Sequence, residues 1–256
     1  MNIIFHERYF NSSYAMDPAA AQGRLEGIIE ILKNNINFEF IEPKPASKED
    51  ILRAHSERHY NYIHRDTLLY ELASLAAGGA ILAAEEAYQG NPTFAVIRPP
   101  GHHASADSCW GFCYFNNISI SLLKLYAVGK INSAFILDFD LHTGDGNINI
   151  LTFRNENFRV KILNPESHDN ASYLKEVKEY MEELEEIDIF VASAGFDQGI
   201  EDWGHLLYPK DYVELGNLMK MYSIKLCNGR RYALLEGGYN HDVLPNNVNA
   251  FCQGFK

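Results

Sequence analysis

The stretch SAFILDFDLHTGDG, residues 133–146, changes character half-way along its length. Its first half is almost entirely apolar, which is typical of a β-strand buried on both faces. Its second half is rich in Asp, His and Gly. Because side chains alternate along an extended chain, Asp138, Asp140 and His142 should share one face, and the intervening apolar residues should share the other.

Two carboxylates and an imidazole on one face at the end of a buried strand carry a high energetic cost. An apolar environment protonates isolated acids unless a positive charge compensates them, and a divalent cation provides that charge. The simpler alternative is that each Asp caps a helix or forms an Asx turn, as single Asp residues at such junctions often do. Three such side chains on one face favour the metal site.

Six further apolar runs predict strands, and helical patterns lie between them. Strands separated by helices are joined by crossovers, so the sequence predicts an α/β fold of three αβα layers with a mostly parallel central sheet. Helices are predicted over residues 173–187 and after Ser47, with Asp50 in a capping position. The six runs are NIIFH (2–6), FEFIE (38–42), TFAVIR (93–98), FRVKIL (158–163), DIFVASAG (188–195) and RYALLEGG (231–238).

The composition fits a single domain over residues 1–256, since 46% of the residues are hydrophobic and no repeat or linker divides the chain. The net charge of -12 argues against nucleic-acid binding, which needs clustered Lys and Arg. The four Cys residues have neither zinc-ribbon nor disulfide-framework spacing, as expected for a cytoplasmic protein.

Two features argue against a membrane protein. The first ten residues do not resemble a signal peptide. The apolar region at 72–84 is shorter than the roughly 20 residues that span a bilayer. We therefore expect a soluble protein without membrane partners.

Polar residues also gather where three other predicted strands end. The segments are RPPGHHA (98–104), SAGFDQG (193–199) and LEGGYN (235–240). Ligand sites in open parallel sheets form outside the carboxyl ends of strands, so these segments could converge. Asp197 alone could be a turn residue. Together with Asp140 and His142 it would complete a three-ligand site with one open position, the arrangement that catalytic zinc uses.

Two anionic ligands would neutralise most of the charge of Zn²⁺, so such a site needs a general base and a donor to the substrate carbonyl. His102 and His103 are the candidate bases. Asp138 and Asp145 could each orient one imidazole through its other nitrogen. Tyr239 is the candidate donor, because the glycines before it permit close backbone approach. Each feature also has a structural alternative: a hydrogen-bonded His pair, or a loop with a packed aromatic ring.

Five motifs occur in an order that resembles the histone deacetylase superfamily, which includes bacterial deacetylase-like amidohydrolases, acetylpolyamine amidohydrolases and acetoin-utilisation proteins. They are RPPGHHA, GFCYFNN (111–117), DFDLHTGDG, AGFD and LEGGYN. The resemblance runs nearly to Lys256, and the residues of RPPGHHA and LEGGYN are closer to the class II and bacterial branches than to class I. It implies the arginase-deacetylase fold and a zinc-dependent deacetylase.

The resemblance implies two metal ions. The catalytic ion, Zn²⁺ or Fe²⁺, would be held by Asp140, His142 and Asp197. A structural K⁺ would lie near Asp138 and neighbouring main-chain oxygens. The chain departs from the family pattern at Thr143, where a second histidine is usual, and at Asn164, where the usual potassium-binding pattern is missing.

The resemblance also assigns substrate and catalytic roles. His103 would be the general base and then acid, and His102 its electrostatic neighbour. Tyr239 would donate to the substrate carbonyl and to the oxyanion. The substrate-binding positions would be Gly111, whose carbonyl accepts the substrate N–H, Phe112, which forms a channel wall, and Gly238, beside the catalytic Tyr.

Two loops that shape the pocket mouth in relatives are shortened or replaced, between His64 and Ala77 and in PESHDNASY (165–173). We therefore expect a wide, shallow pocket that binds peptides weakly and prefers small or bulky acyl compounds. The short region at 60–77 leaves no room for the insertion that narrows the channel of acetylpolyamine amidohydrolases. Polyamine specificity thus ranks below a broader amide or acyl-lysine deacetylase.

The sequence predicts a zinc-dependent amidohydrolase that acts on an acyl-lysine or a small acylated amine. One alternative is a ureohydrolase-like enzyme with two metal ions, although the residues after Asp197 lack the carboxylate spacing of that group. Another alternative is a non-catalytic acyl-ligand sensor or scaffold. The sequence does not indicate the physiological substrate, the acyl chain length or the oligomeric state.

Overall fold

The computed structural model describes residues 1–152 and 157–256, and its core is a parallel sheet. The strands are β1 (Asn2–Ile4), β2 (Glu39–Ile41), β3 (Thr93–Ala95), β4 (Ser133–Asp138), β5 (Arg159–Leu163), β6 (Phe190–Ala194) and β7 (Arg231–Leu235). Their order is β2-β1-β3-β7-β6-β4-β5, and every neighbouring pair of these strands is parallel. Each predicted run contains one strand, so the α/β prediction is confirmed.

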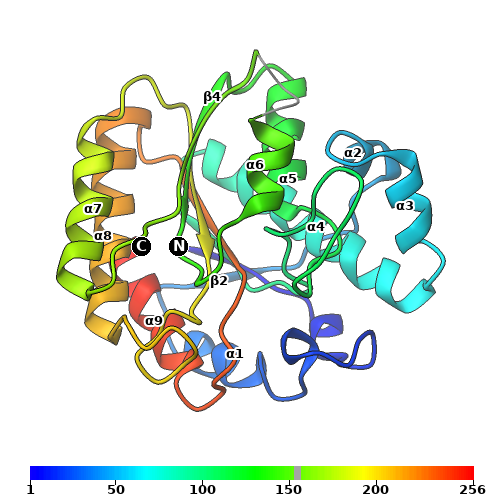
Figure 1. The fold of residues 1–256 in the computed structure, drawn as a ribbon, viewed down its shortest axis with the longest axis horizontal. Helices are drawn as coiled ribbons and strands as arrows, with labels where there is room; N and C mark the ends of the chain where they lie inside the picture. Colours follow the sequence, from blue (N-terminus) through cyan, green and yellow to red (C-terminus); the bar gives the residue numbers. More distant parts are fainter. Residues whose placement is uncertain (153–156) are drawn as a thin grey trace.

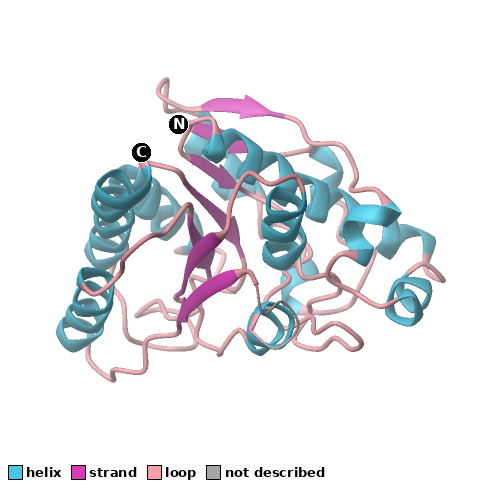
Figure 2. Cartoon of the chain, turned by 90° about the horizontal axis from the view of Figure 1, so that it is seen from above, coloured by secondary structure: helices cyan, strands magenta, loops and turns pink. Residues whose placement is uncertain are grey.

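Helices cover both faces of the sheet and complete the three predicted layers (Figures 1 and 2). They are α1 (Glu26–Lys33), α2 (Lys48–Leu52), α3 (Glu57–Ile63), α4 (Thr67–Tyr88), α5 (Asn117–Ala127), α6 (Asp145–Leu151), α7 (Asn170–Glu182), α8 (Pro209–Cys227) and α9 (Leu244–Phe255), with 3-10 helices at Glu7–Phe10 and Pro18–Ala20. Figure 1 shows α7 and α8 on one side of the strands and α4, α5 and α6 on the other. Extensive contacts join α8 to α9 and α4 to α5.

Three adjacent strands, β4, β6 and β7, form the centre of the core, and all their residues are buried. Burial on both faces explains why their sequences are nearly continuous apolar runs. Each strand ends before its predicted run does. Phe139 and Asp140, for example, leave the sheet after Asp138, and this turn directs polar side chains beyond the strand end.

The predicted helix at 173–187 begins and ends earlier in the structure. Helix α7 starts at Asn170, because the Asp169 side chain accepts a hydrogen bond from the Ser172 N–H and caps it. It ends at Glu182, and Glu186 adopts a left-handed conformation (φ 51°) in the turn toward β6. The predicted cap at Ser47 is confirmed, since its side chain accepts from the Asp50 N–H.

Helix α4 extends beyond the apolar region expected at 72–84. It has 22 residues and is long and apolar enough, by length and composition alone, to cross a membrane. The prediction that this region is too short was therefore wrong. However, 61% of the apolar stretch is buried inside the protein, and α4 packs against α5 and the strands β1, β3 and β7, as a core helix does.

Candidate active site

Four strands that are neighbours in the sheet lead into the polar motifs. The motif segments are 98–104 after β3, 235–240 after β7, 193–199 after β6 and 137–146 at the end of β4. Because all four strands are parallel, their carboxyl ends lie at the same edge of the sheet. The topology therefore brings segments that are far apart in the sequence to one site.

Asp140, His142 and Asp197 form a group that we call the Asp-His-Asp cluster. One ligand atom from each side chain lies within 4.8 Å of the other two. His142 Nδ1 lies 3.2 Å from Asp140 Oδ1 and 3.4 Å from Asp197 Oδ2. Both carboxylates are buried, whereas the His142 side chain is 40% exposed. The three predicted metal ligands are thus adjacent, with solvent access on the imidazole side.

The electrostatics of the Asp-His-Asp cluster favour a bound cation. Burial, together with the charge of Asp140, raises the pKa of Asp197 to about 7. Burial opposes ionisation of Asp140 as well, but His102 and hydrogen bonds from His142 outweigh it and hold the pKa of Asp140 below its ordinary value. Asp197 Oδ2 is buried and accepts no hydrogen bond from the described residues. Two carboxylates and one imidazole, with an unsatisfied oxygen among them, fit Zn²⁺ or Fe²⁺.

Gly237 keeps space open beside this cluster. Its N–H donates to Asp140 Oδ2 at 2.9 Å. A Cβ at this position would lie 2.6 Å from both Asp140 Oδ2 and Asp197 Oδ2, so any side chain would displace the carboxylates. The glycine of the LEGGYN motif is therefore required by the close approach of the backbone to two ligand atoms.

His102 and His103 lie with their ring centroids 4.0 Å apart, and each contacts one of the predicted Asp partners. His102 Nδ1 donates to Asp138 Oδ2 at 3.2 Å. His103 Nδ1 donates to Asp145 Oδ1 at 2.6 Å. Burial disfavours a charged His102, but the carboxylates of Asp140 and Asp138 outweigh it and raise the His102 pKa. Burial and the neighbouring His102 lower the pKa of His103, which can therefore accept a proton near neutral pH.

Tyr239 is held by three residues that the sequence analysis missed. Asp202, buried in the loop after β6, accepts hydrogen bonds from the N–H of Tyr239 at 2.7 Å and from that of the next residue at 2.8 Å. Trp203 stacks on the Tyr239 ring with 4.0 Å between centroids. Arg24 donates to the Gly238 carbonyl at 2.8 Å, and its guanidinium lies 5.6 Å from the Tyr239 ring centroid. Burial raises the pKa of Tyr239, so the phenol keeps its proton.

The GFC segment passes close to the His pair. Gly111 (φ 57°) and Phe112 (φ 66°) are both left-handed, and a Cβ on Gly111 would lie 2.4 Å from His103 Cδ2. The Phe112 ring meets the Tyr239 ring edge to face, with 5.8 Å between centroids. Trp110, the residue before this segment, lies against the His103 ring in a tilted arrangement and was not predicted from the sequence.

An open cavity of about 750 Å³ lies beside Phe112. It is bounded by residues 109–114, by the region from Tyr62 to Leu69, and by Asp17. This is the region where the sequence predicts a shortened rim loop, and the cavity is compatible with a wide pocket mouth.

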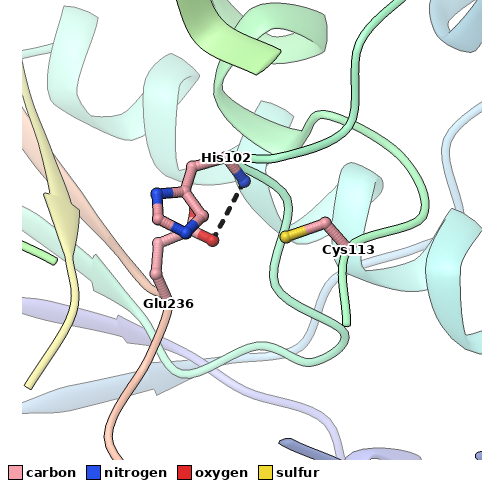
Figure 3. Close-up of side chains that lie close together, drawn as sticks. All are labelled: His102, Cys113 and Glu236. Atoms are coloured by element: carbon pink, nitrogen blue, oxygen red, sulfur yellow. Dashed lines mark hydrogen bonds between the residues drawn. The ribbon is translucent and has the colours of Figure 1, made fainter. Parts of the chain in front are cut away.

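His102, Cys113 and Glu236 form a second group of buried potential ligands, which we call the His-Cys-Glu cluster (Figure 3). Glu236 Oε2 accepts hydrogen bonds from the N–H groups of Gly101 (2.7 Å) and His102 (3.2 Å). Burial raises the pKa of Glu236 to about 7 and that of Cys113 well above its ordinary value. Glu236 thus joins the end of β7 to the segment after β3, a role not predicted from the sequence.

The expected potassium ligand Asp138 is engaged with neighbouring N–H groups. Its Oδ2 accepts from His102 at 3.2 Å and from the Asn147 amide at 3.4 Å, and its Oδ1 accepts from the Asp140 N–H at 3.3 Å. Its main-chain oxygen accepts from the Asn164 amide at 3.3 Å. These hydrogen bonds engage the Asp138 oxygens within the protein, and the potassium site stays a prediction from the sequence.

Comparisons with known proteins show the family of this chain. A profile of the histone deacetylase domain matches residues 66–164. The chain is 30% identical to a probable deacetylase of Archaeoglobus fulgidus over 93% of this chain and 81% of that protein. The chain belongs to the histone deacetylase superfamily. It is also 33% identical to a probable deacetylase of Methanothermobacter thermautotrophicus, over 58% of this chain and 50% of that protein.

More distant members of the histone deacetylase superfamily extend the comparison. A histone deacetylase-like amidohydrolase of Pseudomonas aeruginosa is 23% identical over 87% of this chain and 72% of its own length. The crystal structure of the HDA15 HD domain matches 98% of this chain and 87% of that chain with a TM-score of 0.84 at 21% identity. The structural match shows the fold, and the sequence relatives show membership of a family of deacetylases and amidohydrolases.

Proposed function

We propose that this superfamily member is a zinc-dependent amidohydrolase that removes the acyl group from an N-acylated amine. The observation that best supports the proposal is the Asp-His-Asp cluster, with its unsatisfied buried oxygen, beside the hydrogen-bonded His103 and Asp145. Carboxylate oxygens of the two Asp residues and a nitrogen of the imidazole would hold the ion. Zn²⁺ bound there would polarise the amide carbonyl and make a water molecule more acidic.

In this mechanism the chain's own residues move the protons. Asp145 holds Nδ1 of His103, which leaves Nε2 free to take a proton from water and deliver it to the leaving amine. His102, charged beside Asp138, would stabilise negative charge that develops on the substrate. The protonated hydroxyl of Tyr239 would donate a hydrogen bond to the carbonyl oxygen, and more strongly to the oxyanion.

The substrate would be an acyl-lysine or a small acylated amine. Phe112 would contact the acyl side, and the Gly111 carbonyl would accept the amide N–H. Gly238 would let the backbone approach the substrate closely. The open cavity beside Phe112 supports a site that tolerates bulky groups.

A screen of acetyl-, trifluoroacetyl- and longer acyl-lysines together with acetylpolyamines, using zinc-loaded protein, tests both reaction and substrate class. We expect hydrolysis of several acyl-lysines, loss of activity with a chelator, and recovery with Zn²⁺. No hydrolysis by protein that contains stoichiometric zinc would contradict the proposal and favour an acyl-ligand sensor. Strong discrimination for acetyl-lysine peptides would contradict the open pocket.

A further inference from the structure

We propose that Trp110 is a positioning residue for His103, acting on it directly and through Asp145. The inference rests on the proposed function, because it assigns His103 the proton transfer. It goes beyond that function by adding a third side chain to the His103–Asp145 pair. None of the sequence motifs considered above assigns a role to this tryptophan.

Two contacts connect Trp110 to the pair. The indole Nε1 donates to Asp145 Oδ2 at 2.9 Å, while Asp145 Oδ1 accepts from His103 Nδ1 at 2.6 Å. The indole also lies against the imidazole of His103, with 3.9 Å between centroids and 33° between planes. One side chain therefore restrains both the carboxylate that orients the base and the ring of the base itself.

The two His–Asp pairs show why only one needs this support. The side chain of Asp138, the partner of His102, is 0% exposed, so water cannot compete for its oxygens. The side chain of Asp145, the partner of His103, is 49% exposed at the first residue of α6. Water competes with a hydrogen bond at such a position. The indole N–H occupies the second oxygen of Asp145 and leaves the first oxygen for His103.

The loop that carries Trp110 is fixed at its base by two buried histidines. His55 Nδ1 donates to the Ser105 carbonyl at 3.0 Å, and its Nε2 accepts from the Asn116 N–H at 2.8 Å. His59 Nε2 donates to the Tyr114 carbonyl at 2.7 Å. The tryptophan itself is 55% exposed. Its orientation therefore depends on the loop and on its two contacts rather than on burial.

Positioning predicts a defined kinetic effect. Without the indole, the Asp145 carboxylate can rotate and form hydrogen bonds with water, and the His103 ring can rotate more freely. Both changes would misalign Nε2 of His103 for proton transfer. Small misalignments of this kind can reduce rates up to about 100-fold. Trp110 also lines the open cavity, but its contacts with His103 and Asp145 predict that the larger effect falls on kcat rather than on KM. If Trp110 only contacted the substrate, as part of the pocket wall, its replacement would change KM rather than kcat.

The test is to measure kcat and KM of zinc-loaded full-length Trp110→Phe, Trp110→Ala, Asp145→Asn and the double variant Trp110→Phe/Asp145→Asn. We expect Trp110→Ala to lower kcat about 10-fold to 100-fold, with a smaller change in KM. Trp110→Phe keeps the ring contact and should lie between wild type and Trp110→Ala. In the Asp145→Asn background, Trp110→Phe should have little further effect, because both changes break the same chain of contacts.

A signal independent of turnover completes the test. In wild type the His103 Nδ1 proton, shielded by the indole and bound to Asp145, should give a slowly exchanging imidazole resonance in the proton NMR spectrum. Trp110→Ala should speed its exchange with water at unchanged thermal stability, whereas Ile224→Ala, an exposed apolar side chain on α8, should alter neither kcat nor the resonance. A change in KM alone, fully additive effects in the double variant, or an unchanged resonance in Trp110→Ala would overturn the inference. An inactive wild type that contains zinc would instead refute the proposed function.

Discussion

The Asp-His-Asp cluster and the His-Cys-Glu cluster meet the same distance criterion, because in each the ligand atoms lie within 4.8 Å of one another. Burial raises the pKa of one carboxyl to about 7 in each, Asp197 and Glu236, but the first also contains Asp140, whose pKa lies below its ordinary value, and it is more accessible to solvent. Each has one buried carboxylate oxygen without a hydrogen bond from the described residues, but only the first has two carboxylates and a half-exposed imidazole. In the second, every side chain is buried, and burial raises the pKa of both Cys113 and Glu236.

The difference shows that proximity alone does not make a metal site. A cation needs ionised donors whose lone pairs are not engaged within the protein. In the His-Cys-Glu cluster, Glu236 Oε2 accepts two backbone hydrogen bonds while Oε1 accepts none from the described residues, burial favours the protonated forms of Glu236 and Cys113, and His102 Nδ1 donates to Asp138. We therefore expect one catalytic ion per chain, which also distinguishes the protein from a two-metal ureohydrolase.

Removing a ligand from the Asp-His-Asp cluster should have the largest effect. Asp197→Ala deletes one of two carboxylates, so we expect loss of bound zinc. The value of kcat/KM should fall by more than about 100-fold, because replacing a residue that only hydrogen-bonds to a metal ligand already costs up to that much. Elemental analysis and kinetics on the same preparation measure both. Stoichiometric zinc in Asp197→Ala would show that the ligands are assigned to the wrong residues.

Tyr239→Phe should separate metal binding from catalysis. It removes a hydroxyl that donates only during the reaction, so kcat should fall about 100-fold to 1,000-fold while zinc content is unchanged. The stacking on Trp203 should persist, since the ring is kept. Turnover equal to wild type would refute the role of the phenol.

Glu236→Gln should reveal the neutral state of the His-Cys-Glu cluster. A carboxyl whose pKa is raised to about 7 stabilises the fold fully below its unfolded value of about 4.3, and that contribution is lost as pH rises through 7. The variant should therefore gain stability relative to wild type as pH rises from about 4.3 to 7, by up to about 1.4 kcal/mol per pH unit, and the difference should level off above pH 7. Urea unfolding at pH 5 and pH 8 measures this. A constant difference between the two pH values would mean that Glu236 is not neutral.

Cys113→Ser should have the smallest effect on the metal. If the thiol is not a ligand, zinc content should stay at the wild-type value, and the change should cost about 1–3 kcal/mol of stability at most. Elemental analysis and thermal unfolding test the two expectations. A lower metal content in this variant would make the second cluster part of the metal site.

Much of the fold could be predicted because it depends on local patterns. The buried strands are apolar runs, and the helix that follows Ser47 carries its own cap. The end of α7 was misplaced because Leu184 and Ile187 keep helical spacing but are buried by the turn before β6. Burial in a turn and burial in a helix have the same apolar signature in sequence.

The candidate site was predicted only in part, for a similar reason. Asp140 and His142 stand two residues apart, so their shared location is a local property of the chain. Asp202 and Trp110 act through hydrogen bonds to residues that are 35 or more positions away. Such contacts depend on the folded arrangement of loops and leave no spacing pattern. The sequence offered one indication of the role of such residues, since both tryptophans of the chain lie within a few residues of a recognised motif.

Counting and locating the bound metal would test the assigned ligands most sharply. Elemental analysis of protein equilibrated with Zn²⁺ and freed of excess metal, followed by anomalous diffraction from its crystals, would do both. The ligand assignment predicts one zinc ion per chain, bound between the carboxylates of Asp140 and Asp197 and the imidazole of His142. Two ions, or a single ion held by Cys113 and Glu236, would contradict it.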